Sequence, residues 1–231
     1  MTVKLTWYGH SAFSLEADGK HVVIDPFLTG NPVNNTRADD VYPTTILITH
    51  AHNDHVGDAV DMAKRTGAKI ITINELAGYL GTKGVEAIGG NHGGTIQFDG
   101  GSVKFTQAWH SSVYADEEGN LVAPGVPAGL VVRFGGKTMY FAGDTALFGD
   151  MKFIGEEGLD LAVLPIGDHY TMGPIDAVRA AKLLNARAVL PCHYNTFPLI
   201  EQDGAKFLAE VEAATKSKGI LLTPGDSTEI N

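Results

Sequence analysis

Three histidines and an aspartate lie within six residues, in the stretch His50-Ala51-His52-Asn53-Asp54-His55, directly after the apolar run Thr-Ile-Leu-Ile at 45–48. On an extended backbone His50 and His52, two residues apart, can point to the same side of the chain. Asp54 and His55 follow where the chain turns toward a helix. The loop can therefore offer three neutral nitrogens and one anionic oxygen to one crevice. Zinc accepts this donor set, and so do manganese and iron.

Two other interpretations of such a cluster are a solvated surface loop and core histidines held by hydrogen bonds. A lone histidine usually has one of these explanations. Burying this much polarity after an apolar strand would be costly without a metal ion. The pattern therefore favours a metal site.

Four donors from one loop do not complete the shells of two metal ions, so further ligands are expected from later in the chain. Three side chains share the context of His50, since each follows an apolar strand and precedes a polar loop. They are His110 after Ser-Val-Lys-Phe-Thr-Gln-Ala-Trp, Asp144 after Lys-Thr-Met-Tyr-Phe-Ala-Gly, and His193 after Ala-Arg-Ala-Val-Leu-Pro-Cys. Ligands of layered α/β folds bind beyond the ends of strands. His21 and His92 lack this context and are weaker candidates.

The elements that must position these residues alternate as β-rich, β/α, β-rich and β/α segments. This order predicts an α/β (α+β) fold, a four-layer αββα sandwich of two mixed β-sheets with helices outside. We expect one domain over residues 1–231. Two hairpins are expected through Gly-Gly turns, at 95–108 and 129–143, and a strand at 219–223. Helices are expected at 56–67, 74–84, from Pro174 onward and at 205–217.

Composition narrows the classes of partner. The 27 acidic residues outnumber the 17 basic ones, which disfavours nucleic-acid binding because that depends on Lys and Arg neutralising phosphates. The single cysteine, Cys192, excludes an intramolecular disulfide and a Cys-rich zinc site. We see no secretory signal and no apolar run near the ~18 residues of a membrane span. A cytoplasmic protein without a membrane partner is expected; a homo-oligomer is possible.

The spacing His-x-His-x-Asp-His at 50–55, followed by the three later donors, resembles the metallo-β-lactamase superfamily over nearly the whole chain. More narrowly, the strings WYGHSAFSLE, IDPFLTGNP, YFAGDTALFGDM, PIGDHYTMG and PCHYNTFP resemble small metal-dependent hydrolases of bacteria and archaea. These are similar to L-ascorbate-6-phosphate lactonases and, more distantly, to N-acylphosphatidylethanolamine phospholipases D.

The resemblance implies the αββα fold and a centre with two divalent metal ions, zinc before manganese or iron. It implies that one ion is held by His50, His52 and His110, the other by Asp54, His55 and His193, and that Asp144 bridges both. His52 stands where the superfamily's diiron redox proteins have Glu, which points away from redox chemistry. No insertion resembles the basic arm of the tRNA-processing members.

Two ions sharing a water lower its pKa toward neutrality and create hydroxide at pH 7, which can attack a carbonyl or phosphorus centre. The expected function is therefore a hydrolase that cleaves a small ester, lactone or phosphodiester. A nuclease or phosphodiesterase of the same superfamily is one alternative. A metal-binding protein with a sensory or structural role, without turnover, is another.

Several residues could assist this chemistry. Asp54 can orient the nucleophile, and His10, His169 and Tyr194, all at strand-to-loop junctions, are candidates for substrate contact or proton transfer. Asp25 is expected to hold the metal loop from behind. The loops at 26–43 and 109–128 are expected to form walls of the pocket.

Overall fold

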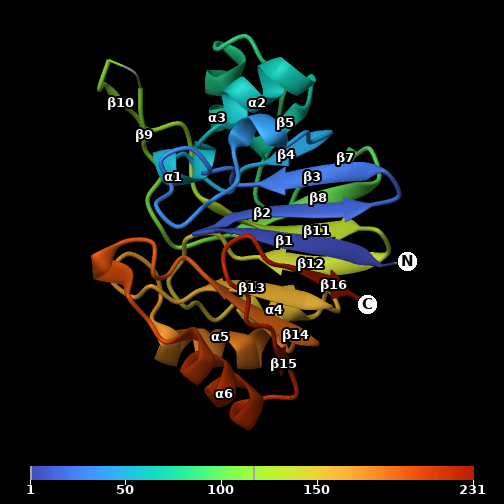
Figure 1. Cartoon of the computed structure of the whole chain (residues 1–231), viewed down its shortest axis with the longest axis vertical. Coiled ribbons are helices and arrows are strands. Elements are labelled where there is room, and N and C mark those ends of the chain that lie inside the picture. The colour runs from blue at the N-terminus through green and yellow to red at the C-terminus, as the bar shows by residue number, and fades with distance from the viewer. Residues whose placement is uncertain (1, 117) are drawn as a thin grey trace.

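Two β-sheets packed face to face form the centre of the computed structural model, which describes residues 2–116 and 118–231 (Figure 1). The strands of the first sheet, in spatial order, are β16 (Ser227–Ile230), β1 (Val3–Gly9), β2 (Ala12–Ala17), β3 (Lys20–Ile24), β4 (Thr45–Leu47), β5 (Lys69–Ile73) and β6 (Ala87–Gly90). Those of the second are β15 (Lys218–Gly219), β14 (Ala188–Cys192), β13 (Leu161–Pro165), β12 (Lys137–Phe141), β11 (Ala128–Phe134), β8 (Gly101–Gln107) and β7 (Thr95–Phe98).

Both sheets are mixed, as predicted. In the first, β16 to β3 pair antiparallel and β3 to β6 pair parallel. In the second, β7 to β12 pair antiparallel and β12 to β15 pair parallel. The parallel strands of each sheet therefore end at one edge, where the loops that follow them meet. A separate pair, β9 (Tyr114–Ala115) and β10 (Leu121–Val122), lies in the loop between β8 and β11.

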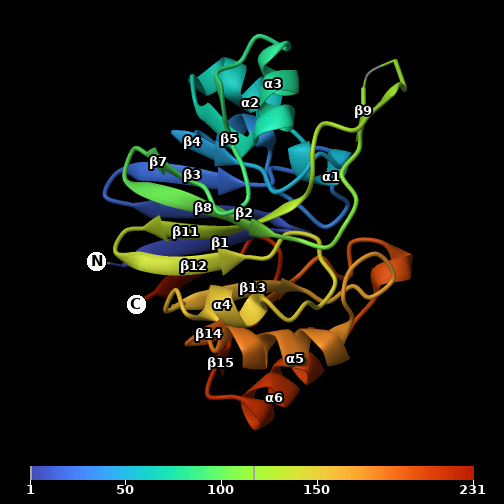
Figure 2. The same cartoon turned by 180° about the vertical axis from the view of Figure 1, so that it is seen from behind.

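Helices cover the outer faces of the two sheets, and Figure 2 shows the same four layers from behind. Near the first sheet are α1 (Asn53–Val56), α2 (Ala59–Thr66) and α3 (Asn74–Gly81), and near the second are α4 (Met151–Gly155), α5 (Pro174–Leu184) and α6 (Gly204–Ala214). The αββα sandwich expected from the sequence is confirmed. Among the described residues no helix is both long and apolar enough to cross a membrane.

The apolar residues of the facing sides of the sheets form one large core, with buried residues such as Leu15, Phe105 and Tyr140. A second core lies beneath α2 and α3, where Met62, Ile70 and Leu80 are buried. Burying both faces of the sheets in this way holds the strand ends in fixed positions. The side chains beyond those ends are therefore presented on a rigid frame.

The two predicted hairpins are present, as β7–β8 and β11–β12. The turn of β11–β12 is Gly135-Gly136 as expected, whereas that of β7–β8 is Asp99-Gly100, because Gly101 pairs with Phe98. Gly135 and Gly136 both have positive φ, of 55° and 74°, which a two-residue turn of this hand requires. The helices predicted at 74–84, from Pro174 and at 205–217 are α3, α5 and α6.

The helix predicted at 56–67 is broken into α1 and α2 by Gly57, which has φ 44° and ψ −126°. A Cβ at Gly57 would lie 2.3 Å from the carbonyl oxygen of Pro26, so no other residue fits this close approach. The strand predicted at 219–223 is wrong for most of its length, because β15 ends at Gly219. The chain leaves the second sheet there and adds β16 to the edge of the first.

Candidate metal centre

The predicted metal ligands meet at one edge of the sandwich, and both sheets contribute to the group. His50 and His52 follow β4, and α1 carries Asp54 and His55. From the second sheet come the residues that follow β8, β12 and β14, namely His110, Asp144 and His193. Residues up to about 140 positions apart in the sequence are therefore neighbours in the structure.

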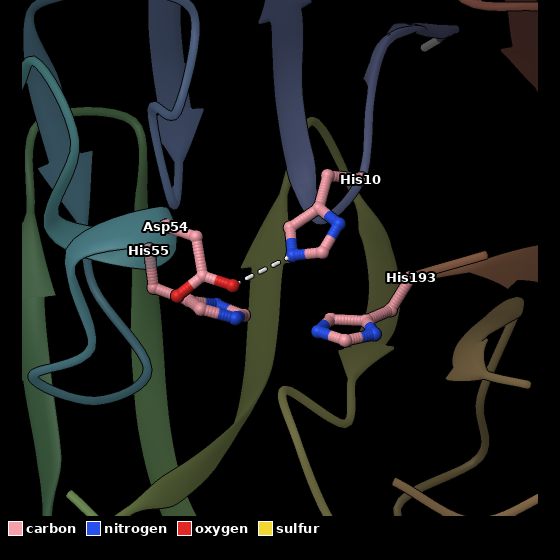
Figure 3. A group of neighbouring side chains, drawn as sticks. All are labelled: His10, Asp54, His55 and His193. Atoms are coloured by element: carbon pink, nitrogen blue, oxygen red, sulfur yellow. Dashed lines mark hydrogen bonds and ion pairs between the residues drawn. The ribbon is translucent and has the colours of Figure 1, made fainter. Parts of the chain in front are cut away.

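These side chains, together with His10, form two groups that could each hold a metal ion. One contains His50, His52, His110 and Asp144, and the other contains His10, Asp54, His55 and His193. Within each group the potential ligand atoms all lie within 4.8 Å of one another. Figure 3 shows the second group, with the four side chains directed toward a common space.

Asp144 lies between the two groups. One carboxylate oxygen, Oδ1, is 3.4 Å from His55 Nε2, and the other, Oδ2, is 3.0 Å from His193 Nε2 and 3.5 Å from His110 Nε2. The residue is only 3% exposed. A carboxylate that reaches histidines of both groups is in position to bridge two ions.

A buried hydrogen-bond network orients the histidines from behind. Asp25 accepts bonds from the backbone N–H of Thr49 at 2.8 Å and from the Thr49 hydroxyl at 2.7 Å. It also accepts a bond from Nδ1 of His55 at 2.8 Å. His50 Nδ1 is 2.9 Å from the Thr49 hydroxyl. Since both histidines are bonded through Nδ1, both direct Nε2 into the centre, which is how outer partners fix metal-binding imidazoles.

Burial keeps most of these histidines neutral. It lowers the pKa of His50 well below the usual range, and positive charge on His55 would lower it further. The pKa values of His52 and His110 are lowered, again mainly by burial. Neutral imidazoles have the lone pair that a metal ion needs.

His55 and Asp144 form the exception, because they are a coupled pair of opposite charge. Burial alone would lower the pKa of His55, but the carboxylates of Asp144 and Asp25 raise it well above the ordinary value. Burial alone would raise the pKa of Asp144, but His193 and His55 hold it well below the ordinary value. In the metal-free protein the carboxylate of Asp144 is therefore ionised, and His55 is in its charged form with both ring nitrogens protonated.

Three buried polar atoms of the centre make no hydrogen bond, namely His55 Nε2, Asp144 Oδ1 and His193 Nδ1, although the first two form the ion pair with each other at 3.4 Å. Unpartnered buried polar atoms are rare because each costs about 1–3 kcal/mol. The donor set therefore fits divalent cations, which would satisfy orphaned nitrogen and oxygen atoms.

Backbone strain also concentrates here. His10, Asp25 and His193 have φ values of 53°, 45° and 52°. Residues other than glycine seldom adopt this left-handed region of the backbone. Such residues persist where the surrounding structure holds them, and they gather at functional sites. All three bind to or point into the centre.

The chain matches the family described as "Beta-lactamase superfamily domain" over residues 20–194, which includes every predicted ligand. The chain belongs to the metallo-β-lactamase superfamily. Within this superfamily it is 50% identical over 229 residues to a UPF0173 metal-dependent hydrolase of Anoxybacillus flavithermus, an alignment that covers 99% of this chain and 100% of the relative. It is 47% identical to a protein of the same name from Pelotomaculum thermopropionicum, with the same coverage.

Among solved structures, Igni18, described as a novel metallo hydrolase from Ignicoccus hospitalis KIN4/I, is 42% identical. It superposes with a TM-score of 0.91 and covers 100% of this chain and 99% of its own. CmlA, a diiron β-hydroxylase from Streptomyces venezuelae, has a TM-score of 0.74 at 15% identity, over 99% of this chain and 54% of its own. That likeness concerns the superfamily fold alone.

A cavity of about 280 Å³ opens onto the centre of this superfamily member. Its lining is His10, His52, Asp54, His110, Ser111, Asp144, Tyr170, His193 and Phe197. Ser111 comes from the loop at 109–128, as expected. None of the lining residues comes from the loop at 26–43, so that loop is not a wall of this cavity. Its residues instead border a separate hollow of about 820 Å³, because the loop folds back onto α2.

Apart from Asp54, which lies in the second donor group, the residues predicted to assist catalysis lie in different surroundings. His10 is fully buried among the ligands. His169 is exposed and packs against Tyr170, and the latter residue lines the cavity in its place. Tyr194 is turned away from the cavity and stacks on Trp7, with 5.7 Å between ring centroids. Tyr194 and Trp7 instead line a separate hollow, together with Gly204 and Pro224.

Three neighbours of the site, Tyr170, Phe197 and Thr196, were not predicted from the sequence. Tyr170 is 54% exposed and Phe197 is 38% exposed, at the mouth of the cavity. Both belong to strings that carry the family resemblance, Tyr170 to PIGDHYTMG and Phe197 to PCHYNTFP. A signal was therefore present, but it marked the loops rather than the individual side chains.

Proposed function

We propose that this chain is a hydrolase with two metal ions that cleaves a small ester or lactone. The observation that carries the proposal is the pair of donor groups that share Asp144. His50, His52 and His110 would hold one ion, Asp54, His55 and His193 the other, and Asp144 both. Zinc is the ion we expect first; manganese and iron accept similar donors.

When bound, two such ions supply an activated water as nucleophile and stabilise negative charge on a substrate oxygen. The chain supplies the orientation. Asp25 and Thr49 hold His50 and His55 with Nε2 directed inward. Asp54 would hold the second ion and accept a hydrogen bond from the attacking water. The Tyr170 hydroxyl and the Ser111 hydroxyl at the cavity mouth are the groups available to bind the substrate or a leaving oxygen.

The cavity favours an uncharged small substrate over a phosphodiester or a nucleic acid. Its described lining contains two aromatic rings, Tyr170 and Phe197, and no lysine or arginine. Phosphate recognition usually relies on Arg or Lys in addition to metal ions. The net charge of −10 further disfavours a polyanion. These features support a small-molecule substrate with an apolar part that lies against the aromatic rings.

The test is a panel of lactones, aryl esters, thioesters and phosphodiesters, assayed with protein reconstituted separately with zinc, manganese and iron. We expect turnover of an ester or lactone and its loss in His52→Ala. His92→Ala is the matched control, because His92 bonds the carbonyl of Pro127 outside the centre. Two bound ions without turnover of any member would favour a sensory role. Turnover of phosphodiesters alone would favour the nuclease alternative.

A further inference from the structure

His10 occupies the turn between β1 and β2, and its side chain is fully buried. Its carbonyl oxygen accepts hydrogen bonds from Trp7 Nε1 at 3.1 Å and from the backbone N–H of His193 at 3.0 Å. The second bond links the two sheets at the centre. Together with its left-handed φ of 53°, these contacts hold the imidazole in one place.

The ring of His10 is held in the same way as the ring of His50. In His50, Nδ1 contacts the buried hydroxyl of Thr49, at 2.9 Å. In His10, Nδ1 contacts the buried hydroxyl of Thr196, at 3.0 Å. In both cases a threonine hydroxyl contacts Nδ1, and Nε2 faces another potential ligand, His52 for His50 and Asp54 for His10. Figure 3 shows the second of these contacts.

The next contact of Thr196 indicates which nitrogen carries the proton. Its hydroxyl lies 3.4 Å from the carbonyl oxygen of Tyr194, which can only accept a hydrogen bond. If the hydroxyl donates there, it accepts from Nδ1–H of His10. Nε2 then carries a lone pair, and it lies 2.9 Å from Oδ2 of Asp54. A lone pair facing a carboxylate is repulsive unless a cation lies between them.

We propose that His10 is a metal ligand, the fourth protein donor to the ion held by Asp54, His55 and His193. This inference rests on the proposed two-metal centre. With Asp144 as bridge, that ion has five protein donors, whereas the ion at His50, His52 and His110 has four. Four donors suit tetrahedral zinc, and a larger set with two carboxylates suits a six-coordinate ion such as Mn²⁺ or Fe²⁺. The two sites therefore differ in metal preference.

The competing arrangement places the proton on Nε2, so that His10 donates a hydrogen bond to Asp54 and only positions it. A crystal structure of the wild-type protein soaked with Mn²⁺, with ions located by anomalous scattering, separates the two. We expect His10 Nε2 at about 2.0–2.2 Å from the second ion. A separation above 3 Å, with the Asp54 hydrogen bond retained, would overturn the inference and leave the two-metal function intact. Absence of ions from both groups would overturn both.

Metal affinity gives a second readout that does not depend on activity. Chelator competition with Mn²⁺ would be measured for wild type, His10→Gln and Thr196→Val. A glutamine side-chain amide can still donate a hydrogen bond to Asp54, so it rescues positioning but replaces imidazole by a weak ligand. Losing an outer hydrogen-bond partner of a ligand typically lowers metal affinity about 10–100-fold. We expect His10→Gln to lower the affinity for one of the two ions by more than this. Thr196→Val should lower the affinity for the same ion within this range. Wild-type affinity in His10→Gln would refute ligation.

Discussion

Replacing Asp25 by Asn removes one charge and one acceptor from the support behind the metal ligands. The carboxylate is 1% exposed and accepts three hydrogen bonds, two from Thr49 and one from Nδ1 of His55. An asparagine amide has the same shape but only one acceptor oxygen. It cannot satisfy the three donors in either of its two orientations.

The two orientations fail in different ways. If the amide nitrogen replaces Oδ1, it faces the backbone N–H of Thr49, and an unsatisfied buried donor costs about 1–3 kcal/mol. If the nitrogen replaces Oδ2, it donates to Nδ1 of His55. The imidazole proton then moves to Nε2, the atom that faces Asp144 at 3.4 Å, and this tautomer cannot bind a metal ion. Losing such an outer partner lowers metal affinity about 10–100-fold, or about 1.4–2.7 kcal/mol.

The assay is chelator competition with Zn²⁺ on metal-free Asp25→Asn and wild type. Asp160→Asn is the matched control, because that carboxylate also accepts a backbone N–H, from Thr138 at 2.9 Å, but precedes β13 at the end of the sheet remote from the centre. We expect weaker binding of one ion in Asp25→Asn and wild-type binding in Asp160→Asn. Unchanged affinity in the first variant, or an equal loss in both, would refute this account of orientation.

Three further outcomes are expected. Burial raises the pKa of the Cys192 thiol well above its usual value, which keeps the thiol in its unreactive protonated form. A thiol reagent at pH 8 should therefore label Cys192 only after unfolding. Rapid labelling of the native protein would contradict this. The pKa of Glu157 is lowered mainly by the hydrogen bond from Lys104, and Glu157 also pairs with Arg133. Glu157→Gln should therefore lower the unfolding free energy of the protein by about 0.5–1 kcal/mol, and by less at high salt. A loss that does not depend on salt would contradict a mainly electrostatic effect. In the metal-free protein, burial lowers the pKa of His10 to about 4. Between pH 6.5 and 4 the unfolded chain therefore binds a proton at His10 that the folded chain does not, which lowers the unfolding free energy by about 3 kcal/mol as the pH falls through this range. Unfolding free energy measured over this range should fall less steeply in His10→Gln, and identical slopes would contradict the assignment.

The layered fold was predictable because each local signal agreed with the global arrangement. Apolar runs ended at Gly or polar loops, and paired glycines marked β7–β8 and β11–β12. The break at Gly57 was not predictable, because it depends on the backbone of Pro26, about 30 residues away. The strand β16 was also missed, since its partner β1 lies at the other end of the chain.

The predicted ligands could be named from the sequence because four of them, His50, His110, Asp144 and His193, each follow an apolar strand, and the other three lie in the short cluster that begins at His50. The place of His10 could not, since it depends on a left-handed turn and on a contact with the opposite sheet through His193. Neither could the difference between His169 and Tyr170, which are adjacent in a loop. Their orientation is decided by local backbone geometry, on which apolar periodicity carries no information.

Metal stoichiometry tests the central claim most directly. Metal-free protein would be titrated with Zn²⁺, and bound ions per chain would be counted by elemental analysis after gel filtration, for wild type and for Asp144→Ala. The arrangement of two donor groups around one shared carboxylate predicts two ions per wild-type chain and the loss of at least one in the variant. One ion or none in the wild type, or two in Asp144→Ala with unchanged affinity, would contradict a bridged pair.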